Sequence, residues 1–531
     1  MKKKMLSLML AALLAFCAEA SALDFGEEYA VKDIAAGKTK SAPVFYEIFT
    51  GSFSDSDRDG TGDLRGIIDR LDYLNDGDPE SGKSLGVRGI WLTPIFPSPS
   101  YHKYDVADYY SVDPAFGTME DLEELIEACH SRGMLIILDL PINHTSVLNN
   151  WFIQFKSAHI THNAGNRYYN LYTWLPADSA LPAGRHFARL EGTGEYYECN
   201  FADNMPELNY DDPAVFDMML DAAKFWLDKG VDGFRFDAAK YIFFGDNPKS
   251  ASFWEHFMAE LRKVKSDIYT VAEVWDGDGV TEKYTSAFNC FDFTVSQANG
   301  LIASTAKQGN VNKLTAYTEA YIRENRELNP ASFPVYFIAN HDTDRAAGYL
   351  TAASGNAQIA ANLYLLSPGT PFIYYGEETG LRGSRGGANT DANRRLHMRW
   401  GDGDTVRDPV GADYDEKKQT PYTVREMLSD GKSLYNYYKR VLRIRSAFPE
   451  ISLGNYSALT LEGTKAGGFT SDLDGSRVTV IHNTTLNTVT VDLKAVEGAC
   501  SSTLECCAGM GGAVLDDGIL TLDSKTSAII R

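Results

Sequence analysis

The chain contains 531 residues, of which 44% are hydrophobic and 23% are charged, as in ordinary globular proteins. This length exceeds what one hydrophobic core usually serves, so we expect one large domain and one or two small ones. The formal net charge of -22 repels phosphate backbones and anionic lipids. It argues against nucleic-acid partners and membrane-surface binding, whereas a neutral substrate such as a sugar is compatible with it.

Residues 1–22 resemble a secretory signal peptide. Three lysines precede an apolar run from Met5 to Phe16, and Ala20-Ser21-Ala22 forms a small-residue cleavage site. The apolar run is too short to span a bilayer, so no membrane span is predicted. We therefore expect a secreted or periplasmic protein. The segment ending at Cys17 also resembles a loose lipoprotein box, so a lipid anchor on Cys17 is the alternative.

From Ala42 onward, apolar β-rich runs alternate with helical patterns. The candidate strands are Val44–Phe49, Val87–Pro94, Met134–Asn143, Val231–Ala238, Ile268–Val274, Phe288–Val295, Pro334–Asn340 and Thr370–Tyr375. Most are continuous apolar runs, which is typical of buried parallel strands. Eight strands separated by helices predict an α/β fold, a (β/α)8 TIM barrel built from residues 42–144 and 212–453.

Two segments depart from this alternation. The stretch 145–211, after the third strand, is far longer than an ordinary connection, so we predict a small inserted domain there. A helix then begins at Asp212 as N-cap, with Pro213 at its first position, and ends at Gly230. After Gly454, short alternating runs such as Arg477–His482 predict a C-terminal all-β sandwich domain at 454–531.

The cysteines define no framework of their own. Those beyond the signal segment are Cys129, Cys199, Cys290, Cys500, Cys506 and Cys507. Their wide spacing matches no zinc pattern, and a chain of this length needs no disulfides. The sequence leaves open whether Cys500 pairs with either of the two vicinal cysteines.

An acidic turn follows the first predicted strand. Side-chain oxygens stand at alternate positions around Gly60, from Asp55, Asp57, Asp59, Thr61 and Asp63. This arrangement suits a hard cation such as Ca²⁺, and a solvated acidic turn is the alternative. Gly66 stands where an EF-hand carries a bidentate glutamate, so the loop is not an EF-hand.

Polar residues cluster where the predicted strands end, which is where barrel enzymes build their active sites. They are Asp139, Asn143 and His144 on the third strand, Arg235 and Asp237 on the fourth, Glu273 on the fifth, and His341 and Asp342 after the seventh. A pair of carboxylates is the minimum equipment for glycoside hydrolysis. Arg235 shares a strand face with Asp237 and is expected to hold that carboxylate ionised. Structural capping of strand ends is the alternative for each residue alone.

These segments, together with Met205–Asn209 in the insertion, resemble the sequence fingerprints of the α-amylase family (glycoside hydrolase family 13). The resemblance covers the chain from Ala42 to its end and implies a glycosidase. It implies Asp237 as nucleophile, Glu273 as general acid/base and Asp342 as transition-state stabiliser. Further residues implied to bind around the sugar at the cleavage point are Arg235, His144 and His341. The apolar neighbours of Glu273 also predict a raised pKa, which a proton donor needs.

The same resemblance implies further binding residues. Tyr104 would be a stacking platform for the sugar, and His102 and Asp105 would bond its hydroxyls, although a surface aromatic loop explains these residues equally well. Arg395 lies in a motif resembling that of the oligosaccharide-cleaving branch, but Leu396-His397 replaces the usual Thr-Pro. The resemblance also implies that Lys240 binds the substrate. The Tyr241 that follows it makes the chain resemble an intermediate bacterial group of the family. The acidic turn resembles a loop that binds calcium in many relatives.

The expected function is a secreted, retaining hydrolase of α-1,4-glucosidic bonds in starch, glycogen or maltooligosaccharides. Ala238 after the nucleophile resembles the α-1,4-cleaving members of the family. An exo-acting α-glucosidase or oligo-1,6-glucosidase is the alternative, favoured if Asp105 and Arg395 meet across the mouth and close the pocket. The long insertion and Ala238 favour an open groove. The intact trio of Asp237, Glu273 and Asp342 disfavours a non-enzymatic sugar-binding homologue.

Overall fold

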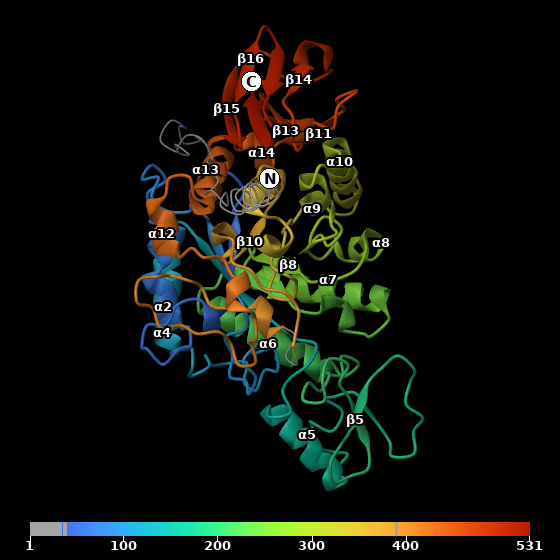
Figure 1. Cartoon of the computed structure of the whole chain (residues 1–531). Helices are drawn as coiled ribbons and strands as arrows, with labels where there is room; N and C mark the ends of the chain where they lie inside the picture. The colour runs from blue at the N-terminus through green and yellow to red at the C-terminus, as the bar shows by residue number, and fades with distance from the viewer. Residues whose placement is uncertain (1–33, 35–39, 388–390) are drawn as a thin grey trace, which may run out of the picture.

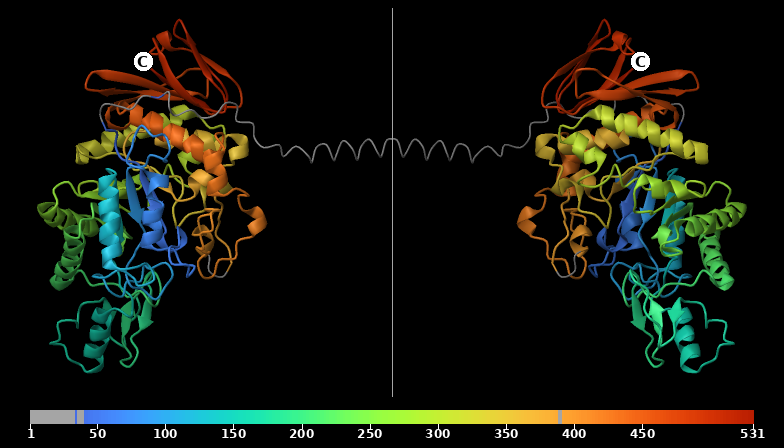
Figure 2. Two further views of the ribbon diagram at one scale, coloured as in Figure 1. Left: turned by 90° about the vertical axis from the view of Figure 1, so that its left-hand side faces the viewer. Right: turned by 90° about the vertical axis from the view of Figure 1, so that its right-hand side faces the viewer.

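The computed structural model describes residue 34, residues 40–387 and residues 391–531. The predicted signal peptide, with Cys17, lies outside the described residues. The central barrel has the inserted segment at one end and the C-terminal sheets at the opposite end (Figures 1 and 2).

A curved parallel sheet forms the centre of the molecule. Its strands lie in the order β10-β1-β2-β3-β7-β8-β9. They are β1 (Phe45–Ile48), β2 (Gly89–Leu92), β3 (Leu135–Leu140), β7 (Gly233–Phe236), β8 (Tyr269–Ala272), β9 (Asn289–Cys290) and β10 (Phe372–Tyr374). Seven of the predicted runs therefore form strands, each shorter than its apolar run, and the predicted barrel class is confirmed.

The remaining run, Pro334–Asn340, closes the sheet without forming a regular strand. Val335 makes one parallel bridge to Phe291, just after β9. The carbonyls of this run accept bonds from both sides, since the N–H of Asp292 donates to Val335 at 3.1 Å and the N–H of Phe372 donates to Tyr336 at 2.8 Å. These separate bonds join the run to β10 and to the residues after β9 without a regular ladder.

Helices cover the outside of the sheet (Figure 1). They are α2 (Leu64–Asp69), α3 (Leu71–Leu74), α4 (Met119–Ser131), α6 (Pro213–Asp228), α7 (Asn247–Val264), α8 (Asp278–Thr281), α9 (Leu301–Ala306), α10 (Val311–Leu328), α11 (Asn356–Leu365), α12 (Val424–Ser429), α13 (Leu434–Ala447) and α14 (Glu450–Leu453). The predicted start of α6 is confirmed, since Asp212 caps it by accepting the N–H of Ala214 at 3.0 Å.

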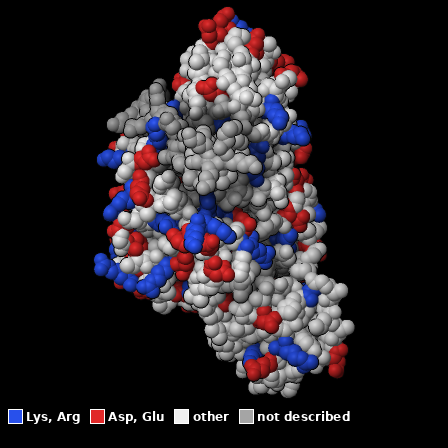
Figure 3. Space-filling view, viewed as in Figure 1, with Lys and Arg blue, Asp and Glu red and all other residues white. Residues whose placement is uncertain are grey.

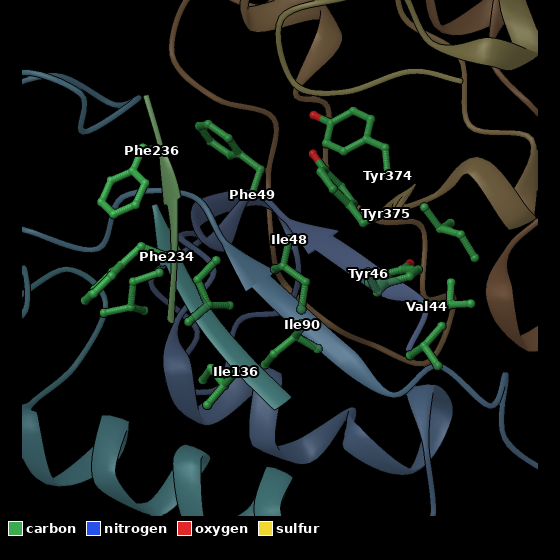
Figure 4. Packing of buried hydrophobic residues seen from close by; sticks show 14 of the residues in the cluster. Val44, Tyr46, Ile48, Phe49, Ile90, Ile136, Phe234, Phe236, Tyr374 and Tyr375 are labelled. Atoms are coloured by element: carbon green, nitrogen blue, oxygen red, sulfur yellow. The ribbon is translucent and has the colours of Figure 1, made fainter. Parts of the chain in front are cut away.

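Side chains alternate between two buried layers along each strand. The inner layer, inside the barrel, consists of Phe45, Trp91, Ile137, Val271, Phe291, Val335, Phe337 and Phe372. The outer layer packs against the helices. In β7 it receives Phe234 and Phe236, which lie on the same side of the strand in Figure 4. The inward positions of β7 are therefore left to Gly233 and Arg235.

The segment after β3 forms a small body beyond the barrel. It contains α5 (Asn150–Ile160) and a sheet in the order β4-β6-β5. These strands are β4 (Trp174–Leu175), β5 (Phe187–Arg189) and β6 (Tyr196–Glu198). The segment starts and ends side by side, because His144 bridges Glu207 in antiparallel fashion. Both of its ends are thus fixed at the carboxyl ends of the barrel strands.

Antiparallel sheets make up the C-terminal part. One has the order β11-β12-β13-β18-β15 and the other β14-β17-β16. The strands are β11 (Asn455–Leu459), β12 (Gly467–Leu473), β13 (Ser476–Asn483), β14 (Val489–Asp492), β15 (Leu504–Gly509), β16 (Ala513–Asp516), β17 (Ile519–Leu522) and β18 (Thr526–Ile530). They dock on the barrel helices through buried polar contacts, such as the 2.9 Å bond from Asn362 of α11 to the carbonyl of Ala508.

Three general features complete the description. The six cysteines within the described residues are all unpaired. Across that same part of the chain, none of the helices is long and apolar enough to cross a membrane. On the face shown in Figure 3, acidic and basic residues are interspersed, so the acidic excess is not gathered into one patch of that face.

Candidate active site

The barrel mouth is polar because the inward position nearest the end of several strands carries a charged side chain. Glu47 follows the inward Phe45 on β1, and Asp139 follows the inward Ile137 on β3. In the same way, Asp237 and Glu273 stand two residues beyond Arg235 and Val271. The two-residue period of a strand thus delivers carboxylates from four strands to one end of the barrel.

Arg235 joins three of these carboxylates. Its Nη1 donates to both oxygens of Asp139, at 2.8 and 3.0 Å, and to Asp237 at 2.6 Å. Its Nη2 donates to Glu273 at 2.8 Å. The guanidinium is wholly buried and lies over the Trp91 ring. Since two adjacent nitrogens of one group bind Asp237 and Glu273, these carboxylates lie within a few ångströms of each other.

Burial dominates the protonation of this cluster. It raises the pKa of Glu273 to about 7, against the opposing effect of Arg235, which confirms the predicted direction. Burial likewise raises the pKa of Asp139 to about 6. It also raises the pKa of Asp237, although Arg235 lowers it, which is the direction expected for the arginine. The arginine is where the sequence placed it, but desolvation, aided by Asp139 and Asp342, outweighs it.

Asp342 faces the opposite electrostatic environment. Burial alone would raise its pKa, but His341 and Arg395 lower it well below the usual range. His341 Nε2 lies 2.9 Å from Asp342, and Arg395 donates to Asp342 at 2.8 Å. His341 Nδ1 lies 2.5 Å from Glu47. These two carboxylates raise the pKa of His341 to about 10, so it is a cation at neutral pH.

The loop after β2 supplies Tyr104, whose hydroxyl donates to Asp139 at 2.8 Å and lies 2.6 Å from His341 Nε2. Asp105 is fully buried and accepts hydrogen bonds from Ser98 and Ser100 and, at 2.9 Å, from Asn204 of the inserted segment. Asp105 therefore ties the loop to the insertion.

Within the part of the chain that the structure describes, no ion pair joins Asp105 to Arg395. Arg395 instead bonds Asp342, the Tyr101 hydroxyl at 3.1 Å and the His341 carbonyl. The hypothetical contact that would have closed the pocket is thus absent from the described residues. His102 lies in the same loop, where burial lowers its pKa to about 4.

The remaining predicted binding residues lie around this cluster. His144 is buried and both of its ring nitrogens are without a hydrogen-bond partner among the described residues. Its ring lies 5.2 Å from that of Phe201, which the insertion contributes. Lys240 bonds the Trp275 carbonyl at 2.8 Å, and Trp275, which is 41% exposed, stacks on Phe293. A polar cluster of buried carboxylates is therefore bordered by aromatic rings suited to sugar faces.

Comparison with known proteins identifies the family. Residues 47–454 match the model of the α-amylase catalytic domain. The chain belongs to the α-amylase family. "Alpha-amylase 3" of Dictyoglomus thermophilum is 35% identical over 83% of this chain and 84% of its own length. An oligo-1,6-glucosidase of Parageobacillus thermoglucosidasius is 28% identical over 83% of this chain and 89% of its own. The chain is thus an α-amylase family glycosidase, in a family that includes hydrolases and transferases.

Solved structures of family members resemble this one along almost their whole length. Eubacterium rectale Amy13B superposes with a TM-score of 0.85 at 30% identity, covering 95% of this chain and 99% of that one. The α-amylase from H. orenii gives a TM-score of 0.78 at 34% identity, covering 92% and 99%. The barrel, the inserted segment and the C-terminal sheets are therefore shared architecture of the family.

The acidic turn after β1 brings together part of its predicted ligand set. Carboxylate oxygens of Asp55, Asp57 and Asp63 lie within 4.8 Å of one another, which suits a hard cation. Asp59 is not in this group, and its carboxylate accepts the backbone N–H of Thr61 at 2.6 Å. The structure therefore supports an acidic cluster of three residues, smaller than the predicted set of five.

Two residues of this family member's site were not singled out from the sequence. Glu47 holds His341, and the ring of Phe201 lies beside that of His144. An acidic residue inside an apolar strand was the available signal for Glu47, because an unpaired buried carboxylate is too costly to keep without a role. Phe201 carried no such signal.

Proposed function

We propose that this chain is a retaining glycoside hydrolase that cleaves α-1,4-glucosidic bonds in starch, glycogen or maltooligosaccharides. One observation carries the proposal: a single buried guanidinium binds both Asp237 and Glu273. Retaining enzymes hold their two carboxylates about 5–5.5 Å apart, because one must attack the sugar directly while the other protonates the leaving oxygen. Two carboxylates sharing one guanidinium support the short separation.

The proposed mechanism assigns a separate task to each carboxylate. Asp237 attacks the anomeric carbon and forms a glycosyl ester, while Glu273 gives its proton to the departing glycosidic oxygen. Glu273 then takes a proton from the water that hydrolyses the ester, which restores both groups. The raised pKa of Glu273, about 7, keeps a proton available near neutral pH. Asp342, whose low pKa keeps it anionic, stabilises the cationic transition state.

The surrounding residues take binding roles in this proposal. His144, whose ring nitrogens have no hydrogen-bond partner among the described residues, and His341, fixed as a cation, face the sugar at the cleavage point. Tyr104 offers its ring as a platform. Arg395 binds next to Asp342, which it bonds at 2.8 Å, and Lys240 binds next to Trp275.

Internal cleavage of α-1,4 chains is the specificity that the site favours. Because Asp105 bonds the inserted segment and Arg395 bonds Asp342, no ion pair between these two described residues closes the mouth. The 35% identity to an α-amylase, against 28% to an oligo-1,6-glucosidase, points the same way. A time course of products from amylose, pullulan, isomaltose and an end-blocked maltoheptaoside tests this, because an exo enzyme leaves the blocked substrate intact.

Substitutions test the catalytic assignment. Asp237→Asn and Glu273→Gln should each lower kcat by several orders of magnitude in a folded protein, and azide should partly restore turnover to Asp237→Ala by entering the vacated space. Glu377→Gln is the matched control, since Glu377 is also a buried glutamate with its pKa raised to about 7, but its side chain bonds Tyr364 and Tyr438 and lies outside the proposed catalytic set. Activity near the wild-type level in either catalytic variant would refute the assignment.

Two further parts of the proposal concern cation and location. The cluster of Asp55, Asp57 and Asp63 would hold Ca²⁺, which would stabilise the turn after β1 by neutralising three converging carboxylates. The signal-like residues 1–22 support export to the periplasm or the medium, with lipidation at Cys17 as the alternative. Fractionation of cells that express the full chain, with labelled palmitate, distinguishes the two.

A further inference from the structure

We infer that the inserted segment contains a zinc site formed by His186, Cys199 and Asp203. The imidazole nitrogen, the thiol sulfur and a carboxylate oxygen of these residues lie within 4.8 Å of one another. His186 Nε2 lies 2.6 Å from Asp203 Oδ1. This cluster is separate from the acidic turn after β1 and from the carboxylates at the barrel mouth.

Strand pairing creates the cluster. β5 and β6 are antiparallel, and Phe187 pairs with Glu198, so the flanking residues His186 and Cys199 are neighbours across the pair. The N–H of Cys199 donates to the carbonyl of His186 at 2.9 Å. The chain then turns back, and the hydroxyl of Tyr197 donates to the Asp203 carbonyl at 2.7 Å, which holds the third ligand beside the other two.

The chemistry of the donors selects the metal. A sulfur, a nitrogen and an oxygen ligand suit Zn²⁺, which accepts all three in a tetrahedral arrangement, whereas Ca²⁺ and Mg²⁺ require oxygen. His186 Nε2 and Asp203 Oδ1, 2.6 Å apart, are closer than two ligands of one tetrahedral Zn²⁺, so these exposed side chains must move apart by rotation when the metal binds. Cys199 must lose its proton, so binding of one Zn²⁺ releases one H⁺ and forms a metal–thiolate bond. Water completes the fourth position.

Exposure and charge both permit an ion to enter. Cys199 is buried at the floor of the cluster, while the side chains of His186 and Asp203 are 57% and 77% exposed. Glu198 and Glu207 lie close enough to Cys199 to affect its thiol, and Arg185 is engaged with both oxygens of Glu198. Because Arg185 is paired with Glu198, the surroundings present no free positive charge among these residues that would repel a cation.

The position of the cluster connects it to the barrel mouth. Cys199 and Asp203 bracket Phe201, whose ring lies against that of His144. Asp203 directly precedes Asn204, which bonds Asp105. A metal that joins residues 199 and 203 would fix this short loop and with it the insertion side of the substrate site. This consequence for activity rests on the proposed function, whereas metal binding itself does not.

The sequence could not reveal this site, because its cysteines match no zinc pattern and the site uses only one of them. Two of its three ligands, His186 and Cys199, flank the paired strands β5 and β6. Only the register of β5 and β6 brings them together.

Cobalt spectroscopy of the full-length protein tests the proposal directly. After treatment with chelator, titration with Co²⁺ should produce a thiolate-to-metal charge-transfer band with one equivalent bound, and Zn²⁺ should displace it. His186→Ala and Asp203→Asn, both at exposed positions, should weaken binding by about tenfold to a hundredfold. Cys199→Ser should abolish the band. Cys129→Ser, at a buried cysteine in α4, is the matched control and should keep it.

The outcomes separate the alternatives. Absence of a thiolate band in the wild type, or a band of equal strength and affinity in His186→Ala and Asp203→Asn, overturns the site. If Cys199→Ser does not fold, the other two variants still decide. Loss of Zn²⁺ should raise KM for maltooligosaccharides and leave kcat unchanged. An inactive wild-type protein that still shows the cobalt band would refute the proposed function while leaving the metal site intact.

Discussion

Replacement of Arg235 by lysine tests whether one guanidinium organises the barrel mouth. Lysine keeps the positive charge, but its single ammonium cannot reproduce the planar fork that reaches Asp139, Asp237 and Glu273. At least two charge-assisted hydrogen bonds should be lost. At about 1.5–3 kcal/mol for each, the free energy of unfolding should fall by about 3–6 kcal/mol. Solvent screening does not reduce this figure, because the Arg235 side chain is wholly buried.

The same substitution should alter the pH dependence of catalysis. Arg235 opposes the burial that raises the pKa of Asp237 and Glu273, so weaker contact with the cation raises both pKa values further. Activity requires Asp237 ionised and Glu273 protonated, so both limbs of the kcat/KM profile should move to higher pH. If one charge-assisted hydrogen bond to Asp237 or Glu273, worth about 1.5–3 kcal/mol, is missing in the transition state, kcat should fall by about 10-fold to 150-fold.

A control variant distinguishes this effect from general destabilisation. Arg445 is also buried, but it bonds backbone carbonyls such as those of Leu365 and Ser367, at 2.8 and 2.6 Å. Arg445→Lys should lower stability in urea unfolding while keeping the wild-type kcat and pH profile. If Arg235→Lys and Arg445→Lys gave the same pH profile, the organising role of Arg235 would be refuted.

Three further predictions follow from other sites. Chelator should lower the melting temperature of the wild type and of Asp59→Asn. It should leave that of Asp57→Asn unchanged, because of these two residues only Asp57 belongs to the acidic cluster. An unchanged melting temperature in the wild type would mean that the turn holds no metal. Asp105→Ala should reduce kcat/KM about tenfold on both short and long chains, and glucose as the only early product would contradict the open groove. Burial lowers the pKa of His482 from 6.5 to about 3, so below pH 6.5 the unfolded state binds more protons than the folded state and the free energy of unfolding falls as pH falls towards 3. His482→Gln should weaken this pH dependence in urea unfolding. The same pH dependence in the variant and the wild type would contradict the prediction.

The location of the catalytic carboxylates was predictable because it depends on local periodicity. Asp237 and Glu273 each stand near the end of an apolar run, and the barrel rule places all such ends at one mouth. The direction of the Glu273 pKa followed from its apolar neighbours. The pKa of Asp237 did not follow from Arg235, because the cost of burying a carboxylate depends on how much water the complete fold excludes.

Pairings between distant residues were not predictable. Glu47 and His341 are separated by 294 positions, and Asn204 and Asp105 by 99. A sequence periodicity identifies which face a residue occupies, but it does not identify the partner that another segment will bring to that face. The same limitation explains why the sequence left open whether Asp105 and Arg395 meet, and in the structure each bonds a different partner.

The placement of the C-terminal strand bears on how the enzyme can be attached to a solid support. β18 runs between β13 and β15, and Arg531 follows it directly. The sheets that contain β18 lie at the opposite end of the barrel from the inserted segment (Figure 1). Immobilisation through Arg531 should therefore present the barrel mouth to the solution, so that long polymers can reach it. A flexible spacer is needed at that point, because a bulky anchor would press against a strand paired on both edges.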